Sequence, residues 1–313
     1  MHLQPAPPAV LRGSSYPRRA LPHRPASAVR VLAVESIGYL VPHTEFMARI
    51  HSVFARACNI ACRDTLLTLC AAGAGQGPTT LTLAHRVPDL RELFHVGERV
   101  QCRDGCMRSG RAEVRLTDAA VWWPADPGVP LPWVRIQAHL GGVALARAQR
   151  HHQHTSVIDR EGAAAASALH DACRALDHPR AARQIERLVG WGEGLTPAGD
   201  DFLIGLLAGL DAFVHGEPRR PRFRSALACV ISGLTPRTTP IAAHYLRLAA
   251  GGHYTEPLIR LRRALLCEDN DDVVDAALRS ALAVGATSGA DTVSGLSAGL
   301  RAWLPVAACI EAG

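Results

Sequence analysis

The stretch Gly190-Trp-Gly-Glu-Gly-Leu-Thr-Pro-Ala-Gly-Asp-Asp201 runs directly into an apolar segment, residues 202–210. That segment has the length and leucine content of a helix. Glycines let backbone N–H groups approach a ligand, and Thr196 before Pro197 predicts an N-cap with proline in the first turn. The free N–H groups and partial positive charge of a helix start attract anions. The stretch therefore predicts either an anion-binding loop or a glycine-packed, buried helix start.

A second copy of this motif, Gly285-Ala-Thr-Ser-Gly-Ala-Asp291, lies near the end of the chain. Both copies continue into the same pattern, Gly-Leu-x-Ala-Gly-Leu, at residues 205–210 and 295–300. Ser288, three residues before Asp291, predicts a helix start similar to a capping box. The repetition predicts an internal pseudo-symmetry in which two polar helix starts converge on one cleft, with glycines that allow the helices to pack closely. A purely architectural repeat remains the alternative.

An arginine lies between the two copies, in Thr235-Pro-Arg-Thr-Thr-Pro240. A guanidinium beside two hydroxyls at a helix entry offers a bidentate cationic fork and short donors to a phosphate or carboxylate. A turn with a solvent-facing arginine is the alternative. This segment is therefore a second candidate anion-binding element.

Composition excludes several classes of function. The chain has 313 residues, 48% of them hydrophobic, and a formal charge of +6. Residues 1–30 hold five arginines and no acidic residue, so the remainder is nearly neutral and a nucleic-acid surface is not expected. The sequence contains no lysine, which excludes Schiff-base chemistry and the lysine of a Walker A loop.

Cysteine use and hydropathy indicate the location. The nine cysteines are odd in number and scattered, and no hydrophobic signal region precedes them, so we expect a reducing cytoplasm. The longest apolar run, residues 202–210, is too short to cross a bilayer, so no membrane segment is expected.

The whole chain predicts an α+β fold. Residues 1–28, rich in arginine and proline, are expected to be a disordered extension. Residues 29–132 hold strand-length segments that favour an antiparallel sheet or a small barrel, and residues 133–313 form a mainly helical domain with the repeated glycine motif. The expected strands are 31–34, 51–54, 65–69, 79–83, 99–102 and 112–116. The expected helices are 143–149, 163–176, 179–189, 202–214, 222–234, 241–250, 256–266, 271–284 and 291–308.

Three motifs in this order resemble one family. They are Gly192-x-Gly-Leu-Thr-Pro-x-Gly-Asp-Asp-Phe-Leu-x-Gly205, Arg237-Thr-Thr239 and Gly285-x-Thr-Ser-Gly-x-Asp-x-x-x-Gly295. They are similar to the AllH-type subunit of bacterial oxamate carbamoyltransferase and its family, many of whose members have no assigned function. Towards the N-terminus, Ser52-Val-Phe54, Asn59 and Gly77-Pro78 match more loosely. The Arg/Pro-rich extension and Ala242-Ala243, where a serine is expected, depart from the pattern and leave the exact substrate open.

The resemblance implies a cytoplasmic multi-subunit enzyme of allantoin breakdown that converts oxalurate and phosphate to oxamate and carbamoyl phosphate. This chain would be one subunit, beside FdrA-like and AllG-like partners, and its small anionic ligand would be carbamoyl phosphate, oxamate or oxalurate. Two alternatives stay open: a non-catalytic assembly or scaffold subunit, and a phosphate- or nucleotide-binding protein of another pathway.

Carbamoyl transfer needs an anion cradle and carbonyl polarisation more than a covalent nucleophile. We therefore expect the catalytic residues to be Asp200, Asp201, Arg237 and Asp291. The residues expected to bind substrate or phosphate are Gly192, Gly194, Thr196, Gly199, Thr238, Thr287, Ser288 and Gly289. The three aspartates are also candidate ligands for Mg²⁺, the one cofactor considered, or they orient the acceptor nitrogen. The hypothesis requires Asp201, Arg237 and Asp291 to face one solvent-reachable hollow.

Overall fold

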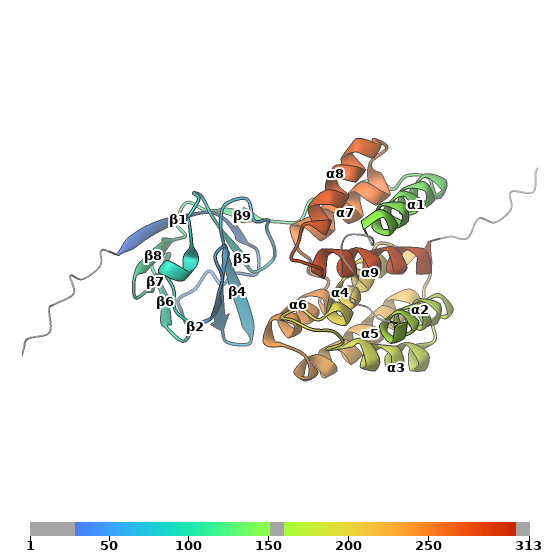
Figure 1. Cartoon of the computed structure of the whole chain (residues 1–313), viewed down its shortest axis with the longest axis horizontal. Helices are drawn as coiled ribbons and strands as arrows, with labels where there is room; N and C mark the ends of the chain where they lie inside the picture. Colours follow the sequence, from blue (N-terminus) through green and yellow to red (C-terminus); the bar gives the residue numbers. More distant parts are fainter. Residues whose placement is uncertain (1–28, 151–159, 305–313) are drawn as a thin grey trace, which may run out of the picture.

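The computed structural model describes residues 29–150 and 160–304 and confirms the predicted α+β fold. All described strands lie between residues 30 and 122, and all described α-helices lie between residues 133 and 303. Figure 1 shows the strands and the helices as two neighbouring parts of the molecule. The extension expected at residues 1–28 lies outside the described residues, and a domain boundary at residue 132 remains a prediction.

The strands close into a barrel, which is one of the two predicted arrangements. Their order is β5-β4-β3-β2-β6-β7-β8-β1-β9, and an additional pairing of β5 with β1 closes the sheet. Most pairs are antiparallel, but β1 with β8, β1 with β9, and β4 with β5 are parallel. The strands are β1 (Arg30–Gly38), β2 (Phe46–Val53), β3 (Ala57–Cys62), β4 (Thr65–Cys70), β5 (Thr80–Leu83), β6 (Arg99–Arg103), β7 (Cys106–Ser109), β8 (Ala112–Arg115) and β9 (Ala120–Trp122).

Sequence patterns missed three of these strands, β3, β7 and β9. The first two contain cysteines, and Cys58, Cys62 and Cys106 are buried as free thiols. A free cysteine packs as a small apolar residue, and Cys58 and Cys62 of β3 belong to the barrel core.

The nine helices of the described residues match the nine expected segments, although α1 begins ten residues earlier than expected. The predicted end of the last helix, residue 308, lies outside the described residues. The helices are α1 (Trp133–Arg150), α2 (Arg160–Ala175), α3 (His178–Leu188), α4 (Ala198–Asp211), α5 (Arg220–Leu234), α6 (Pro240–Ala250), α7 (Glu256–Cys267), α8 (Asp271–Leu282) and α9 (Ser288–Trp303).

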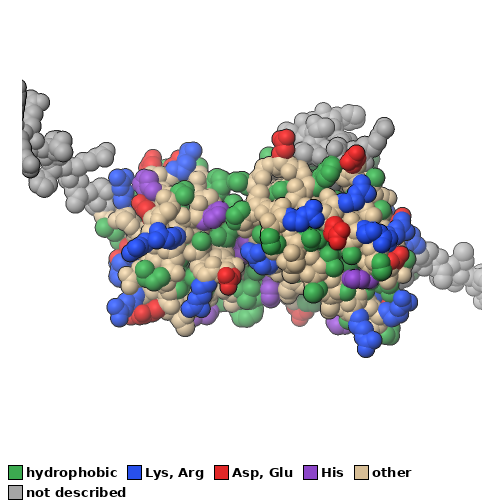
Figure 2. All heavy atoms as spheres, turned by 90° about the horizontal axis from the view of Figure 1, so that it is seen from below, with side chains coloured by type: hydrophobic (Ala, Val, Ile, Leu, Met, Phe, Trp, Pro, Cys, Tyr) green, Lys and Arg blue, Asp and Glu red, His purple; other side chains and the backbone are tan. Residues whose placement is uncertain are grey.

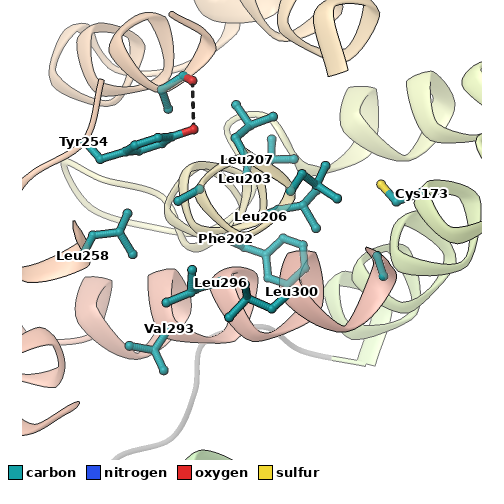
Figure 3. Close-up of a cluster of buried hydrophobic side chains, with 14 of the residues drawn as sticks. Cys173, Phe202, Leu203, Leu206, Leu207, Tyr254, Leu258, Val293, Leu296 and Leu300 are labelled. Carbon is teal, nitrogen blue, oxygen red and sulfur yellow. Dashed lines mark hydrogen bonds between the residues drawn. The ribbon is translucent and has the colours of Figure 1, made fainter. Parts of the chain in front are cut away.

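Helix α4 lies at the centre of the helical part. Twelve of its fourteen residues are buried, which is the behaviour expected of a helix that is apolar on all sides. Figure 3 shows Leu203 and Leu206 of α4 in one cluster with Leu296 and Leu300 of α9. The barrel has a separate hydrophobic core of its own.

Helices α4 and α9 pack backbone to backbone through the repeated glycines. A Cβ at Gly205 would lie 1.9 Å from the carbonyl oxygen of Thr292, and one at Gly295 would lie 1.9 Å from that of Phe202. These distances leave no room for any side chain. The close packing predicted from the glycine spacing is therefore confirmed, and each helix is the other's partner.

The barrel and the helical part meet along α6 and α7. The Nδ1 atom of buried His244 accepts a hydrogen bond from the Leu66 N–H at 3.3 Å, so its Nε2 carries the proton towards Thr79 Oγ1 at 3.1 Å. The Gln76 N–H donates to Glu256 Oε2 at 3.1 Å, and the Glu256 N–H donates to the Gln76 carbonyl at 2.9 Å. Figure 2 shows the two parts in contact, with arginine side chains spread over both.

Candidate functional site

The two copies of the glycine motif meet at their hydroxyls. Thr196 Oγ1 and Ser288 Oγ lie 2.7 Å apart, although the two residues are 92 positions apart in the chain. Both capping predictions were wrong, because α4 begins after Pro197 and α9 after Thr287, with no side-chain cap on either. The hydroxyls that were expected to cap the helices instead face each other between them.

Gly199 and Gly289 have the same architectural role in the two copies. A Cβ at Gly199 would lie 2.0 Å from the Leu188 carbonyl oxygen, and one at Gly289 would lie 2.3 Å from that of Ala281. Their N–H groups donate to the carbonyls of Trp191 and Val284 at 2.9 Å each. These amides are therefore already used, and the structure does not support the expectation that they bind an anion.

Gly192 and Gly194 differ from this pair, because both are exposed and have positive φ, 106° and 92°. Neither N–H group makes a hydrogen bond within the described residues. A Cβ at Gly192 would lie 2.8 Å from the Ala198 nitrogen, whereas the space around Gly194 is open. The loop of the first glycine motif, residues 190–197 and called the first loop below, therefore keeps two amide donors for a ligand.

Asp200 ties the arginine turn to the first loop. Its Oδ1 accepts from the Gly190 N–H at 2.9 Å, and its Oδ2 accepts from the Thr238 hydroxyl. Asp200 is fully buried, and burial raises its pKa while the two hydrogen bonds lower it. Since both carboxylate oxygens are engaged, Asp200 acts by holding the neighbouring loop in place.

The tie places Arg237 beside the first loop. A Cβ at Gly190 would lie 2.8 Å from the Arg237 carbonyl oxygen, and the Thr239 hydroxyl donates to the Leu195 carbonyl. The Arg237 side chain is exposed and makes no salt bridge or hydrogen bond within the described part of the chain. Its guanidinium therefore remains available to an anion.

Asp201 lies beneath the two hydroxyls and is only 6% exposed. Burial raises its pKa to about 8, and hydrogen bonds from Ser288 and Thr196 oppose this shift. The nearby carboxylates of Asp291 and Asp200 raise the pKa further. Its Oδ2 is buried without a hydrogen-bond partner among the residues that the structure describes. At neutral pH the neutral acid therefore predominates, and it can act as a donor.

The three aspartates come together but do not line an open hollow, since each is at least nine-tenths buried. The expectation that Asp201 and Asp291 share a solvent-reachable hollow with Arg237 is therefore not met, because of the three only Arg237 is exposed. Asp291 is 1% exposed, and its charge acts on Asp201. Across residues 29–150 and 160–304, no group of three or more His, Cys, Asp or Glu side chains is arranged to hold a metal ion. The role of Asp200, Asp201 and Asp291 as Mg²⁺ ligands stays a prediction. The layer near solvent consists of the exposed Arg237 and first-loop glycines with the half-buried Thr287 and Ser288.

Sequence patterns missed Tyr245, which extends from α6 between the barrel and the site. Its hydroxyl hydrogen-bonds Thr68 of β4, and burial, followed by the charges of Cys70 and Asp201, raises its pKa. Thr68 Oγ1 continues the chain of polar contacts by donating to Asn59 Oδ1 at 2.9 Å. No local pattern pairs a helical tyrosine with a strand far away in sequence, so only the folded chain reveals this contact.

Comparison with protein families identifies the chain. A family model described as "Oxamate carbamoyltransferase subunit AllH" matches residues 188–300, and a model described as "AllH family N-terminal domain" matches residues 30–121. The chain belongs to the AllH family. The AllH model begins at the last residue of α3 and covers both glycine loops and the Arg237 turn, while the N-terminal model covers almost the whole barrel.

No solved structure matches the chain. Among the described helices, none has both the length and the apolar character needed to cross a membrane.

Proposed function

We propose that this AllH-family chain is a subunit of an oxamate carbamoyltransferase-like enzyme and binds a small anion where its two glycine loops meet. The reaction converts oxalurate and phosphate to oxamate and carbamoyl phosphate. One observation carries the proposal: the contact of Thr196 with Ser288 and the tie of Asp200 to Thr238 bring three separate loops to one place. The exposed Arg237 guanidinium, which has no partner among the described residues, supplies the positive charge of the proposed site.

The chemistry of the three loops suits carbamoyl transfer. The amides of Gly192 and Gly194 and the Arg237 guanidinium are suited to hold phosphate oxygens, and Ser288 and Thr287 add hydroxyl donors. When a phosphate oxygen attacks the ureido carbonyl, the bond to the oxamate nitrogen breaks and that nitrogen takes a proton. The neutral carboxyl of Asp201 is buried beneath the hydroxyls of Thr196 and Ser288, so its proposed role is to orient these hydroxyls and to supply, through one of them, the proton that the nitrogen takes.

The same proposal extends to the partners, the cellular location and the pathway of the subunit. We propose FdrA-like and AllG-like partner subunits, a cytoplasmic location and a role in allantoin degradation. The two alternatives, a scaffold subunit and a stand-alone phosphate- or nucleotide-binding protein, make different predictions for ligand binding by the isolated chain.

A thermal-shift experiment with phosphate, carbamoyl phosphate, oxalurate and ATP separates these cases. A ligand present at 100 times its dissociation constant stabilises the chain by about 2.7 kcal/mol. We expect phosphate or carbamoyl phosphate to stabilise the wild type, and Arg237→Ala to abolish the effect. Arg222→Ala is the matched control, because Arg222 is also exposed but lies near the far end of α5, about 18 Å along the helix from Leu234.

Other outcomes point elsewhere. If no anion stabilises the chain and partner subunits alone do so, the scaffold alternative holds. If ATP stabilises it without partners, the nucleotide-binding alternative holds. Full carbamoyl phosphate formation by a folded Arg237→Ala variant in the assembled complex would remove Arg237 from the site.

A further inference from the structure

A second candidate ligand site lies in a cleft between the barrel and the helical part. The cleft has a volume of about 690 Å³ and is formed by the connection from β4 to β5, the start of α7 and the loop after α8. Small-molecule sites typically have volumes of about 300–1,000 Å³. The cleft is therefore large enough for a small metabolite, and residues from both parts of the chain line it.

The cleft adjoins the loop junction, which is the place where Thr196 of the first glycine motif meets Ser288 of the second. Gly285, the first residue of the second glycine motif, lines it. A Cβ at Gly285 would lie 3.3 Å from Ser288 Oγ, the atom that meets Thr196. A ligand in the cleft would therefore lie next to the proposed anion site without occupying it.

Two arginines, one from each part, line the cleft. Arg56, which follows β2, is exposed and forms no salt bridge with any described residue. Among the described residues, Arg260 of α7 forms one ion pair, in which its Nη1 lies 3.9 Å from Glu256 Oε1. Glu256 also holds the Gln76 N–H through its other oxygen. Both guanidiniums therefore keep most of their donors for a ligand, and a carboxylate matches their planar geometry.

Glu35 of β1 adds the opposite charge to the same cleft. It is exposed and makes no ion pair within the described residues. A ligand that satisfies all three side chains needs a carboxylate for the arginines and N–H donors for Glu35. A simple dicarboxylate has no N–H group and, when ionised, acts only as an acceptor, and its second negative charge would face Glu35.

We propose that this cleft binds a small organic acid that carries N–H groups beside its carboxylate. Arg56 and Arg260 hold the carboxylate, and Glu35 accepts hydrogen bonds from the N–H groups. The inference deepens the proposed function and rests on it for the identity of the acid, a carbamoyl acceptor or its carbamoylated form. It places that acid beside the phosphate at the loop junction.

Isothermal titration of the full chain with oxamate and oxalate tests the assignment, because oxalate replaces the amide group of oxamate with a second carboxylate. We expect wild type to prefer oxamate, and Arg56→Ala and Arg260→Ala each to weaken oxamate binding by about tenfold or more. Glu35→Gln should reduce the preference for oxamate over oxalate by about tenfold. Arg111→Ala, at an exposed barrel turn outside the cleft, is the control and should leave both affinities unchanged.

The result separates this inference from the proposed function. Failure of wild type to bind oxamate at millimolar concentration overturns the cleft assignment, as does unchanged binding in both arginine variants or an unchanged preference in Glu35→Gln. If Arg237→Ala abolishes the response to phosphate while the cleft variants keep wild-type oxamate binding, the proposed anion site stands and the cleft site falls. If the cleft variants lose oxamate binding and Arg237→Ala keeps the response to phosphate, the cleft site stands and the proposed anion site falls.

Discussion

Replacing Gly205 by alanine tests the packing that brings the two glycine loops together. The added methyl would lie 1.9 Å from the Thr292 carbonyl oxygen and 2.7 Å from the Leu296 nitrogen. Both are backbone atoms, so no side chain can rotate away. The two helices must instead separate by about 1 Å before the methyl fits.

The magnitude follows from this separation. Overpacking a core costs about 1–3 kcal/mol, and sometimes more. A clash with backbone atoms should cost an energy at the upper end of this range, because backbone atoms cannot rotate away. A gap of about 1 Å between the helices also loses up to half of the dispersion energy of the atom pairs that it separates. We therefore expect Gly205→Ala to lower the free energy of unfolding by about 3 kcal/mol or more. Gly209→Ala should cost less, because its methyl would lie 2.5 Å from the nearest atom.

Urea unfolding followed by circular dichroism at the helix band measures the effect. Gly141→Ala is the matched control, because Gly141 is exposed within α1 and its Cβ position has no neighbour within 4 Å. Alanine there should stabilise the helix by up to about 1 kcal/mol. If Gly205→Ala proves as stable as Gly141→Ala, the two helices are not in backbone contact and the reasoning about the loop junction fails with it.

Two further predictions concern the aspartates. Asp200→Ala should lower the free energy of unfolding by about 3 kcal/mol, because it leaves the Gly190 N–H and the Thr238 hydroxyl without their partner, and Asp200→Asn should cost less; urea titration of both variants checks the order. The pKa of Asp201, about 8 in the folded chain, lies above the value of about 3.9 in an unfolded chain, so the native state binds the extra proton between these values and wild-type stability falls as pH rises from about 4 to about 8. Asp201→Asn has no carboxyl to titrate, so its free energy of unfolding relative to wild type should rise between about pH 4 and about pH 8. Urea titrations at several pH values measure this difference. If the free energies of unfolding of the variant and the wild type change in parallel with pH, Asp201 is not a buried, neutral acid.

Local patterns were sufficient for most of the fold. Residues 202–210 are almost uniformly apolar, and this predicted the helix that the structure places at the centre. The glycine pairs Gly205/Gly209 and Gly295/Gly299 predicted close helix packing, because glycines one turn apart share a face. Strand β3 was missed because alanine and asparagine, which are depleted in strands, make up half of its six residues.

The candidate site was predictable in composition but not in arrangement. The motifs pointed to Asp200, Asp201 and Arg237 as site residues, and we expected all three side chains to be exposed to a ligand. The structure buries the two carboxylates and leaves the guanidinium exposed. Burial depends on what packs above a residue, and here that cover comes from loops distant in sequence.

The sequence by itself determined the order of a strand part and a helical part, the central apolar helix and the two repeated loops, because periodicity and glycine spacing act over a few neighbouring residues. Only the tertiary structure decided that β5 pairs with β1 to close the barrel, that Thr196 meets Ser288, and that Arg56 and Arg260 share a cleft. Each of these joins segments far apart in the chain. Such contacts arise from the packing of whole elements, which no short stretch of residues encodes.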